Sequence, residues 1–443
     1  MGKQTGRVIV IGPYLRTRRG DPDAREDSSA IRGSDARLEE AVGLARAIDL
    51  TIADALVAPV SQIRPATYLG KGKVEEITGL VASHEAELVV MDCALSPIQQ
   101  RNLEKAWRTK VLDRTGLILE IFGRRAKTKE GSLQVELAHL NYQRSRLVRS
   151  WTHLERQRGG FGFMGGPGET QIEADRRLIG DRITRLENEL KKVQATRRLH
   201  RAGRQRVPYR VVALVGYTNA GKSTLFNRLT RSEVQAADML FATLDPTLRA
   251  LNLPHGGKAM LSDTVGFISN LPTQLVAAFR ATLEEVLEAD VVLHVRDISH
   301  EDSEAQEQDV EAVLRQLGID PAGGQRIIEV WNKIDRLSAE ERENIENIAA
   351  RRPPDRPCFL VSAETGEGID RLLAAIEDLL AATRATLHIS IDAADGAGVS
   401  WLHRNSEVLD KSLQDGRYEM TVRVDETKRD LVINRFDAVP LAP

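Results

Sequence analysis

Apolar runs and amphipathic stretches alternate over the first quarter of the chain. The runs are typical of strands, and the stretches, with apolar residues every three or four positions, are typical of helices. In chain order they lie at residues 7–11, 34–48, 55–59, 74–83, 88–91, 97 onward and 110–112. Strands alternating with helices predict a small α/β domain, for which we take residues 1–123. The Gly-Lys-Gly-Lys at 70–73 could contact an anion, but no strand leads into it, so we predict a plain turn.

In the next two stretches, apolar residues recur at heptad spacing. The first carries Leu133, Leu137, Leu140, Leu147, Trp151 and Leu154, and the second carries Ile172, Ile179, Ile183, Leu186, Leu190 and Val193. Each set predicts a helix with one apolar seam, and the two helices would pair as an antiparallel hairpin over residues 124–207. Between them, residues 159–168 contain six glycines. This composition excludes helix and predicts a flexible tip.

The rest of the chain again alternates between strand and helix patterns. Strand candidates lie at residues 211–215, 248–253, 258–262, 290–295, 326–331 and 358–361. Helical patterns lie at 272–287, 303–317, 338–350 and 369–381, and residues 254–257 carry a hairpin signal. We predict a doubly wound sheet for residues 208–383, with ligand loops at the strand ends. Residues 384–443 have two strand candidates, 387–391 and 418–424, around a helix, and predict a small α/β unit.

Composition limits the class of protein. The 443 residues are 42% hydrophobic and 28% charged, as in a soluble globular protein of several domains. The two cysteines, Cys93 and Cys358, are far apart in the sequence, so they imply no disulfide framework and fit a reducing compartment. The N-terminus has no apolar signal segment, and no run approaches the ~18 apolar residues of a membrane helix. We therefore expect a cytoplasmic monomer without a membrane segment.

The net charge of −2 hides an uneven distribution. Between residues 124 and 210, Lys and Arg outnumber Asp and Glu by 21 to 9. Residues 124–210 therefore have an excess of twelve positive charges, and the rest of the chain an excess of fourteen negative ones. A local excess of this size is typical of an element that binds nucleic acid. The alternative is a solvated helical face.

Three apolar side chains, Phe161, Phe163 and Met164, lie in the glycine-rich tip, where no core is within reach. Aromatic side chains between two basic helices favour insertion into a structured RNA, where they can stack on bases. We therefore predict an RNA contact formed by Gly160, Phe161, Phe163, Met164, Gly165 and Gly166. The alternative is a long linker whose aromatic residues are incidental.

A phosphate-binding motif follows the strand candidate at 211–215. Its residues are Gly216, Tyr217, Thr218, Asn219, Ala220, Gly221, Lys222, Ser223 and Thr224, with the spacing G-x-x-x-x-G-K-S. The glycines let backbone N–H groups point at phosphates, and the start of the next helix favours an anion. Lys222 adds a positive charge for the outer phosphates, and the Ser223 hydroxyl suits Mg²⁺.

Four further segments follow in the order that a guanine-nucleotide site requires. They are Phe241, Ala242, Thr243, Leu244 and Asp245; Asp263, Thr264, Val265 and Gly266; Asn332, Lys333, Ile334 and Asp335; and Ser362, Ala363 and Glu364. Thr243 would bind Mg²⁺ together with Ser223 and close on the γ-phosphate, with Thr247 as a competing candidate. Asp263 would hold Mg²⁺ through water, and the Gly266 N–H would approach the γ-phosphate.

Asp335 determines the base specificity in this prediction. Its carboxylate would accept two hydrogen bonds from the ring N–H and the exocyclic amine of guanine, and adenine cannot supply that pair of donors. Residues 362–364 would support the base with backbone N–H groups. The sequence thus predicts an enzyme that hydrolyses GTP, with Lys222, Thr243 and Gly266 as its catalytic groups.

This ordered set resembles the Ras-like GTPases of the translation-factor-related class, and within that class the HflX-type ribosome-binding GTPases. The GTPase part of the resemblance rests on residues 216–224, 241–247, 263–267 and 332–335. The more specific part precedes it, in residues 113–120 (DRTGLILE), 134–137 (QVEL), 151–155 (WTHLE) and 168–171 (GETQ). Generic GTPases lack this second group.

The resemblance implies an N-terminal α/β subdomain, a GTPase domain, and a helical hairpin whose glycine tip reaches the peptidyl-transferase region of the large ribosomal subunit. It also implies binding to the large (50S) subunit and its rRNA and, in some members, splitting of ribosomes under stress. Some members use ATP through the N-terminal region, but no motif here locates such a site.

Two positions bear on the rate of hydrolysis. Phe267 stands where many GTPases outside the family have a water-orienting glutamine, so we expect slow intrinsic hydrolysis that a partner stimulates. Asn219 matches GTPases that use K⁺ to neutralise developing charge. The alternative is an asparagine that only stabilises the loop.

Two other classes of protein stay open at this point. One is an RNA-binding or RNA-remodelling protein in which GTP, or ATP at the N-terminal region, acts as a switch. The other is an interaction scaffold in which the hairpin is a protein coiled coil. RNA binding would weaken steeply with salt, whereas coiled-coil association would not.

Overall fold

The computed structural model describes residues 6–15, 32–157, 167–204, 210–232, 240–241, 243, 247–269, 283, 285–319, 326–353, 356–381 and 384–441. The chain divides into two compact units, Met1–Leu251 with Lys258–Ile369, and Asn252–Gly257 with Asp370–Pro443. The described residues form three β-sheets. Within this described part, no helix is both long and apolar enough to cross a membrane.

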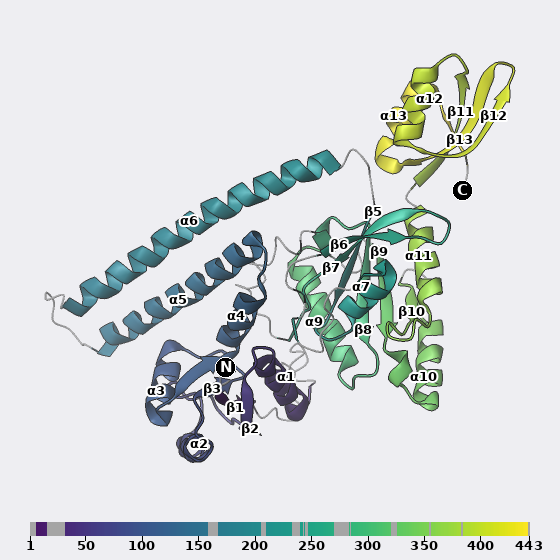
Figure 1. Ribbon diagram of the computed structural model, residues 1–443. Coiled ribbons are helices and arrows are strands. Elements are labelled where there is room, and N and C mark those ends of the chain that lie inside the picture. The colour runs from purple at the N-terminus through teal and green to yellow at the C-terminus, as the bar shows by residue number, and fades with distance from the viewer. Residues whose placement is uncertain are drawn as a thin grey trace, which may run out of the picture. The chain divides into compact units, whose positions relative to one another are not determined.

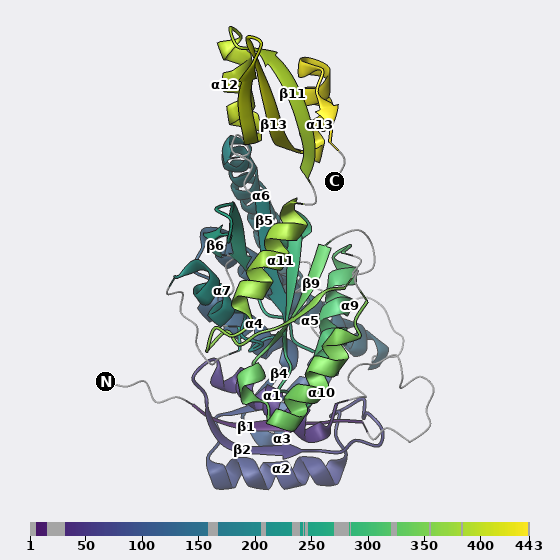
Figure 2. The same ribbon diagram turned by 90° about the vertical axis from the view of Figure 1, so that its right-hand side faces the viewer.

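The N-terminal strands form a parallel sheet in the order β2-β1-β3-β4. The strands are β1 (Arg7–Gly12), β2 (Thr51–Val57), β3 (Leu88–Met91) and β4 (Lys110–Asp113), and the helices are α1 (Ser34–Arg46), α2 (Lys71–His84), α3 (Pro97–Trp107) and α4 (Arg114–Arg125). Along β1, Val8 and Val10 pack with α1 and α4, whereas Ile9 and Ile11 pack with α2 and α3. Helices therefore cover both faces of the sheet, as the alternating pattern predicts (Figure 2).

The prediction of a plain turn at residues 70–73 is wrong. Helix α2 already begins at Lys71, and Gly70 serves as its N-cap in an extended conformation. The apolar residues from Val74 onward are buried against the sheet. Packing of this face stabilises the helix enough to accept a glycine in its first turn.

Helices α5 (Lys129–Gln157) and α6 (Pro167–Arg204) run side by side and antiparallel, as the heptad pattern predicts (Figure 1). Among the described residues of the seam, those that are fully buried are Leu133, Ile183 and Leu186. On the exposed side, the Arg182 guanidinium of α6 lies 2.7 Å from the Glu136 carboxylate of α5. The apolar seam therefore holds the two helices together, and the ion pair adds little because it is exposed.

The segment between these helices is shorter than the sequence predicts. Helix α6 begins at Pro167, inside the segment 159–168 that we expected to exclude helix. Proline is favoured in the first turn of a helix, where its missing N–H costs nothing. The predicted RNA contacts, Gly160 to Gly166, lie outside the described residues.

The third region has a six-stranded sheet in the order β10-β9-β8-β5-β7-β6, and its strands from β10 to β7 are parallel. The strands are β5 (Arg210–Gly216), β6 (Thr247–Asn252), β7 (Lys258–Asp263), β8 (Val291–Asp297), β9 (Arg326–Asn332) and β10 (Cys358–Leu360). The helices include α7 (Lys222–Thr230), α9 (Ser303–Gln316) and α10 (Ala339–Ala350). The carboxyl ends of β5, β7, β8 and β9 therefore meet at one edge, where doubly wound sheets bind their ligands.

The C-terminal unit is built around the antiparallel sheet β12-β13-β11-β14. Its elements are α11 (Ile369–Ala381), β11 (Arg384–Asp392), α12 (Gly396–Asn405), β12 (Glu407–Gln414), β13 (Arg417–Asp425), α13 (Glu426–Phe436) and β14 (Val439–Pro440). The predicted strands at 387–391 and 418–424 and the helix between them are confirmed. The sequence missed β12, because nearly all of its side chains are exposed or half-buried and no apolar alternation marks it.

Because His294 is buried, we predict that the folded protein loses stability in mild acid. It is 4% exposed on β8, and burial, with the positive charge of Arg296, lowers its pKa to about 4. Between about pH 6.5 and 4 the unfolded chain therefore binds a proton that the folded chain does not, so stability falls as the pH falls. We expect His294 to contribute about 2 kcal/mol of this loss between pH 7 and pH 5.

Urea unfolding of wild type and His294→Leu at both pH values measures this contribution. The variant should lose less stability on acidification, and the exposed His403→Leu should behave as wild type. If wild type and His294→Leu lose the same free energy of unfolding, His294 is not the titrating group.

Candidate functional site

The candidate site lies where the parallel strands of the six-stranded sheet end. The phosphate loop joins β5 to α7, residues 263–266 end and follow β7, and residues 332–335 end and follow β9. Gly221 lies at the tightest point of the loop, where φ is +90° and a Cβ would lie 2.2 Å from the Asn332 Nδ2. Only glycine fits this conformation and this close approach. Segments far apart in sequence are thus brought together at one edge.

Lys222 is the buried cation of the site. It is 6% exposed, and its ammonium donates a hydrogen bond to the Tyr217 carbonyl at 2.6 Å. Burial lowers the pKa of Lys222 to about 8, although the Asp263 carboxylate acts in the opposite direction. A Cβ on Gly266 would lie 3.0 Å from the Lys222 Nζ, so the backbone after β7 adjoins the lysine. A phosphate bound here would restore the charged form of Lys222, since a nearby anion raises a lysine pKa.

Three oxygen atoms converge beside Lys222. The Ser223 hydroxyl lies 3.0 Å from the Thr243 hydroxyl, and each hydroxyl lies 2.8 Å from Oδ2 of Asp263. Adjacent ligands of an octahedral Mg²⁺ lie about 2.9 Å apart, because its bonds are 2.0–2.1 Å long. The other Asp263 oxygen, Oδ1, is buried and has no hydrogen-bond partner among the described residues. The Ser223 and Thr243 hydroxyls therefore have the spacing of two adjacent Mg²⁺ ligands, and the Asp263 carboxylate lies beside them.

Of the two candidate switch threonines, Thr243 lies in this oxygen cluster, whereas Thr247 begins β6. Phe241, two residues before Thr243, has a left-handed backbone with φ of 57°, which is strained for a bulky residue. Its ring is 2% exposed and packs edge-on against Phe122 of α4, with the ring centroids 4.7 Å apart. The predicted site residues that lie outside the described part of this segment are Ala242, Leu244 and Asp245.

Asn332 connects the phosphate loop to the loop after β10. Its side-chain amide donates to the Ala220 carbonyl at 2.9 Å, and its oxygen accepts from the Ala363 N–H at 3.0 Å. Lys333 has a left-handed backbone and donates to the Asp297 carboxylate at 2.6 Å. The side-chain amide of Asn332 therefore holds the phosphate loop and the loop after β10 together.

Asp335 lies exposed in the short 3₁₀ helix Ile334–Arg336, where its carboxylate is open to a base. The third predicted group, residues 362–364, is held by Arg228 of α7, which donates to the Ala363 carbonyl at 3.1 Å and also to the Glu364 carbonyl. Arg228 and Asp297 are site residues that we did not predict from the sequence. Neither belongs to one of the motifs, and only contacts in space assign them to the site.

The segment after β7 is bonded directly to the phosphate loop. The Thr218 N–H donates to the Phe267 carbonyl at 2.7 Å, and the Phe267 N–H donates to the Gly216 carbonyl at 3.1 Å. The Phe267 ring is 1% exposed and belongs to the hydrophobic core. A side chain buried in this way has no group with which to orient a water molecule. Asn219, by contrast, is exposed and has a left-handed backbone, which asparagine tolerates.

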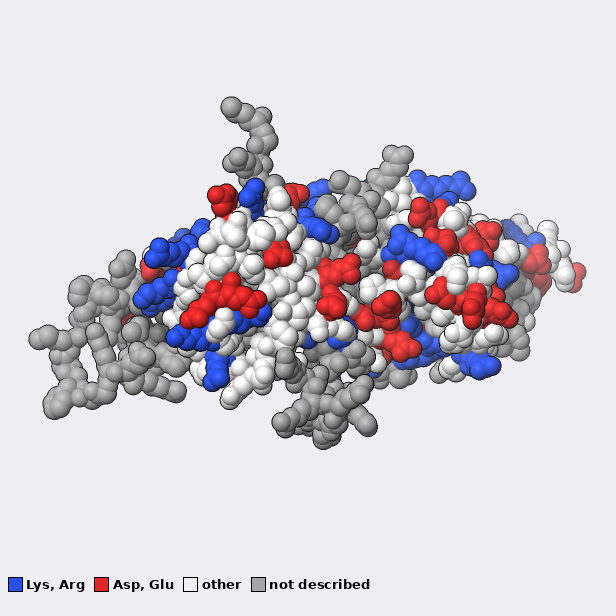
Figure 3. Space-filling view, turned by 90° about the horizontal axis from the view of Figure 1, so that it is seen from below, with Lys and Arg blue, Asp and Glu red and all other residues white. Residues whose placement is uncertain are grey.

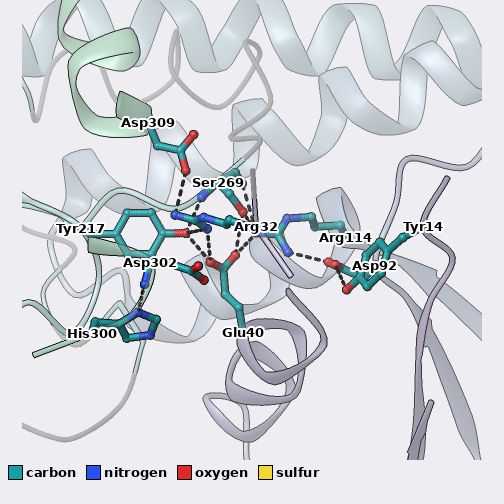
Figure 4. Close-up of polar contacts among 10 residues, drawn as sticks. All are labelled: Tyr14, Arg32, Glu40, Asp92, Arg114, Tyr217, Ser269, His300, Asp302 and Asp309. Carbon is teal, nitrogen blue, oxygen red and sulfur yellow. Dashed lines mark hydrogen bonds and ion pairs between the residues drawn. The ribbon is translucent and has the colours of Figure 1, made fainter. Parts of the chain in front are cut away.

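Residues from the N-terminal helices reach the site (Figure 4). Glu40 of α1 accepts hydrogen bonds from the Tyr217 hydroxyl and, at 2.9 Å, from the Ser269 hydroxyl. The Tyr217 hydroxyl itself accepts from the Ser269 N–H and from the Arg32 guanidinium, both at 2.8 Å. Arg114, the first residue of α4, donates to Glu40 and, at 3.0 Å, to the Ser269 carbonyl.

Each charged group of this cluster has a partner of opposite charge. Arg32 also pairs with Asp309 of α9 at 3.0 Å, and Arg114 pairs with Asp92 at 2.5 Å. Burial alone would raise the pKa of Glu40, but its guanidinium partners and its hydrogen bonds hold that pKa below the usual range. Of this cluster, only Tyr217 was predicted from the sequence, because Glu40 and Ser269 are 229 positions apart and follow no local spacing.

These features define a P-loop GTPase. Comparison with known families agrees. Residues 211–333 match the profile of the 50S ribosome-binding GTPase, and residues 35–123 and 125–204 match those of the GTP-binding GTPase N-terminal and Middle Region. Residues 348–440 match the HflX C-terminal domain.

Similar proteins narrow the class. The chain is 51% identical over 373 residues to GTPase HflX of Magnetococcus marinus, with 84% of each chain covered, and 45% identical over 362 residues to GTPase HflX of Escherichia coli, covering 81% of this chain and 83% of that one. The crystal structure of SsGBP with GDP aligns with a TM-score of 0.48 and 23% identity, over 85% of this chain and 98% of the other. The chain belongs to the HflX family of GTPases. It binds and hydrolyses GTP, as the sequence predicts.

Asp335→Asn tests the predicted base contact. An amide cannot accept the two hydrogen bonds that guanine offers, but it can donate to the additional carbonyl of xanthine. We expect affinity for GTP to fall by about a thousandfold, and XTP to bind more tightly than GTP. Equilibrium titration with both nucleotides measures the change, with the exposed Glu340→Gln as a control. If Asp335→Asn still prefers GTP to XTP as strongly as the wild type does, Asp335 does not contact the base.

Proposed function

We propose that this protein binds the large ribosomal subunit and its rRNA through the hairpin α5–α6, and that GTP controls this contact in the cytoplasm. Splitting or rescue of ribosomes under stress would be the outcome. The observation that supports the proposal is a polar connection between the GTP site and the hairpin.

Two consecutive residues make this connection. Arg114 bonds to Ser269, three residues beyond the Gly266 that we assign to the γ-phosphate. Its neighbour Asp113 accepts hydrogen bonds from Tyr142 and Arg146 of α5, each at 2.5 Å. A displacement of the segment after β7 would therefore act on α4 and, through Asp113, on the base of the hairpin.

The charge of the hairpin suits an RNA partner. Basic residues that are exposed on α6 are Arg176, Arg177, Arg182, Arg185, Lys191 and Lys192. Acidic residues that are exposed on the same helix are Glu173, Asp175, Asp181, Glu187 and Glu189. On the face that Figure 3 shows, basic and acidic side chains are likewise interleaved. Phosphate groups of rRNA would be bound by the basic side chains among these. Contacts from the aromatic tip stay a prediction.

Within the GTP site we assign the outer phosphates to Lys222 and to the Gly266 N–H. Ser223 and Thr243 would bind Mg²⁺, with Asp263 acting through water. Bound Mg²⁺ would neutralise charge on the phosphates as the terminal bond breaks. K⁺ near Asn219 is a further candidate for this role, and it stays a prediction.

Co-sedimentation tests the partner. The full chain is mixed with 30S, 50S or 70S particles in the presence of a GTP analogue, GDP or no nucleotide. We expect it to pellet with 50S particles, and more with the GTP analogue than with GDP. Equal pelleting in all nucleotide states would contradict control by GTP, and no pelleting with any particle would return the hairpin to the role of a protein scaffold.

Two variants serve as controls for this experiment. Lys222→Ala should abolish the response to nucleotide but keep the basal affinity for RNA. Deletion of residues 160–166 should lower the affinity for 50S particles and leave GTP binding intact. Unchanged affinity for 50S particles after the deletion would show that the tip of the hairpin does not contact the subunit.

Stimulation by the subunit is a second expected outcome. Because Phe267 offers no group that orients water, GTP hydrolysis by the free protein should be slow, and 50S particles should accelerate it by about 10³-fold or more. Phosphate release is measured with and without particles, in potassium and in sodium buffers. Equal rates with and without particles would show that the chain is catalytically complete, and equal rates in both buffers would exclude a role for K⁺.

A further inference from the structure

Every described segment that would contact the γ-phosphate or Mg²⁺ also touches a helix of the N-terminal sheet. Phe241 and Leu240 precede Thr243, Ser269 follows Gly266, and Tyr217 lies in the phosphate loop. These four residues contact α1 or α4. Contacts with α1 and α4 therefore influence how these segments are placed around a bound nucleotide.

The first contact is apolar and lies before Thr243. The Phe241 ring packs on Phe122 of α4, and a Cβ on Gly43 of α1 would lie 3.1 Å from the Leu240 side chain. The left-handed backbone of Phe241 is costly by itself, so the buried ring has to hold it in place. In this arrangement the Thr243 hydroxyl meets Ser223 and Asp263.

The second contact is polar and lies after Gly266. Glu40 accepts the Ser269 and Tyr217 hydroxyls, and the Tyr217 oxygen accepts the Ser269 N–H. Glu40 therefore fixes the segment after Gly266 against the phosphate loop. With its two bonds to Ser269, Arg114 fixes the same segment from α4.

We propose that Phe122 and Glu40 are positioning residues that favour the GTP-bound over the GDP-bound arrangement of the site. The inference rests on the proposed nucleotide site. Only GTP has a γ-phosphate for Thr243 and Gly266 to contact, so residues that hold these two segments closed strengthen binding of GTP more than binding of GDP. The N-terminal α/β region thereby acts as a built-in selector of the nucleotide state.

The test compares affinities for a fluorescent non-hydrolysable GTP analogue and for fluorescent GDP, at equilibrium, with Mg²⁺ and the full chain. The variants are Glu40→Gln, which keeps the volume of the side chain and removes its charge, and Phe122→Leu, which keeps an apolar side chain and removes the ring. We expect each to lower the ratio of GTP-analogue to GDP affinity by about tenfold.

The matched controls are Glu39→Gln, an exposed neighbour on α1, and Leu103→Val, a core substitution on α3 against the opposite face of the N-terminal sheet. Both should keep the wild-type ratio, even where Leu103→Val lowers the melting temperature. An unchanged ratio in Glu40→Gln and Phe122→Leu, or an equal drop in Leu103→Val, would overturn the proposal.

Lys222→Ala separates failure of this inference from failure of the proposed site. If that variant loses affinity for both nucleotides while Glu40→Gln and Phe122→Leu keep the wild-type ratio, the site is correct and the selector is wrong. If Lys222→Ala binds both nucleotides as wild type does, the site itself is wrong, and the selector fails with it.

Discussion

The carboxylate of Glu40, whose side chain is only 12% exposed, connects the two α/β sheets of the larger unit through hydrogen bonds to Tyr217, Ser269 and Arg114. A buried charge is tolerated only when it is paired and hydrogen-bonded, so these partners have to stay together. Removing one of them would leave an uncompensated charge in the core. The phosphate loop and the segment after β7 are therefore not free to move independently of helix α1.

Helix α4 extends this constraint to the hairpin. Arg114 at its start bonds to Ser269, its residue Phe122 supports Phe241, and Asp113 at its N-cap holds Tyr142 of α5. One helix thus touches both segments that we assign to the γ-phosphate and also the basic hairpin. A coupling of this kind requires an element whose position both ligands influence, and we propose α4 as that element.

The sequence predicted which segments meet at the carboxyl edge of the six-stranded sheet, because these segments are short motifs at strand ends. Local periodicity likewise predicted the alternating sheets and the hairpin seam. It failed at residues 70–73, where tertiary packing outweighs the glycines. It also failed for β12, which has no apolar alternation, and for the Glu40 cluster. Contacts between residues as distant as Glu40 and Ser269 depend on how two sheets pack against each other. Local spacing in the sequence carries no information about that packing.

Thermodynamic linkage provides the most direct test of the central claim, that GTP and the large subunit act on one another through this chain. If GTP strengthens binding to 50S particles, then 50S particles must strengthen binding of GTP over GDP by the same factor. The measurement is the ratio of GTP-analogue to GDP affinity, at equilibrium, with and without saturating 50S particles. We predict that this ratio rises by about fivefold or more when the particles are present. An identical ratio in both conditions would contradict it.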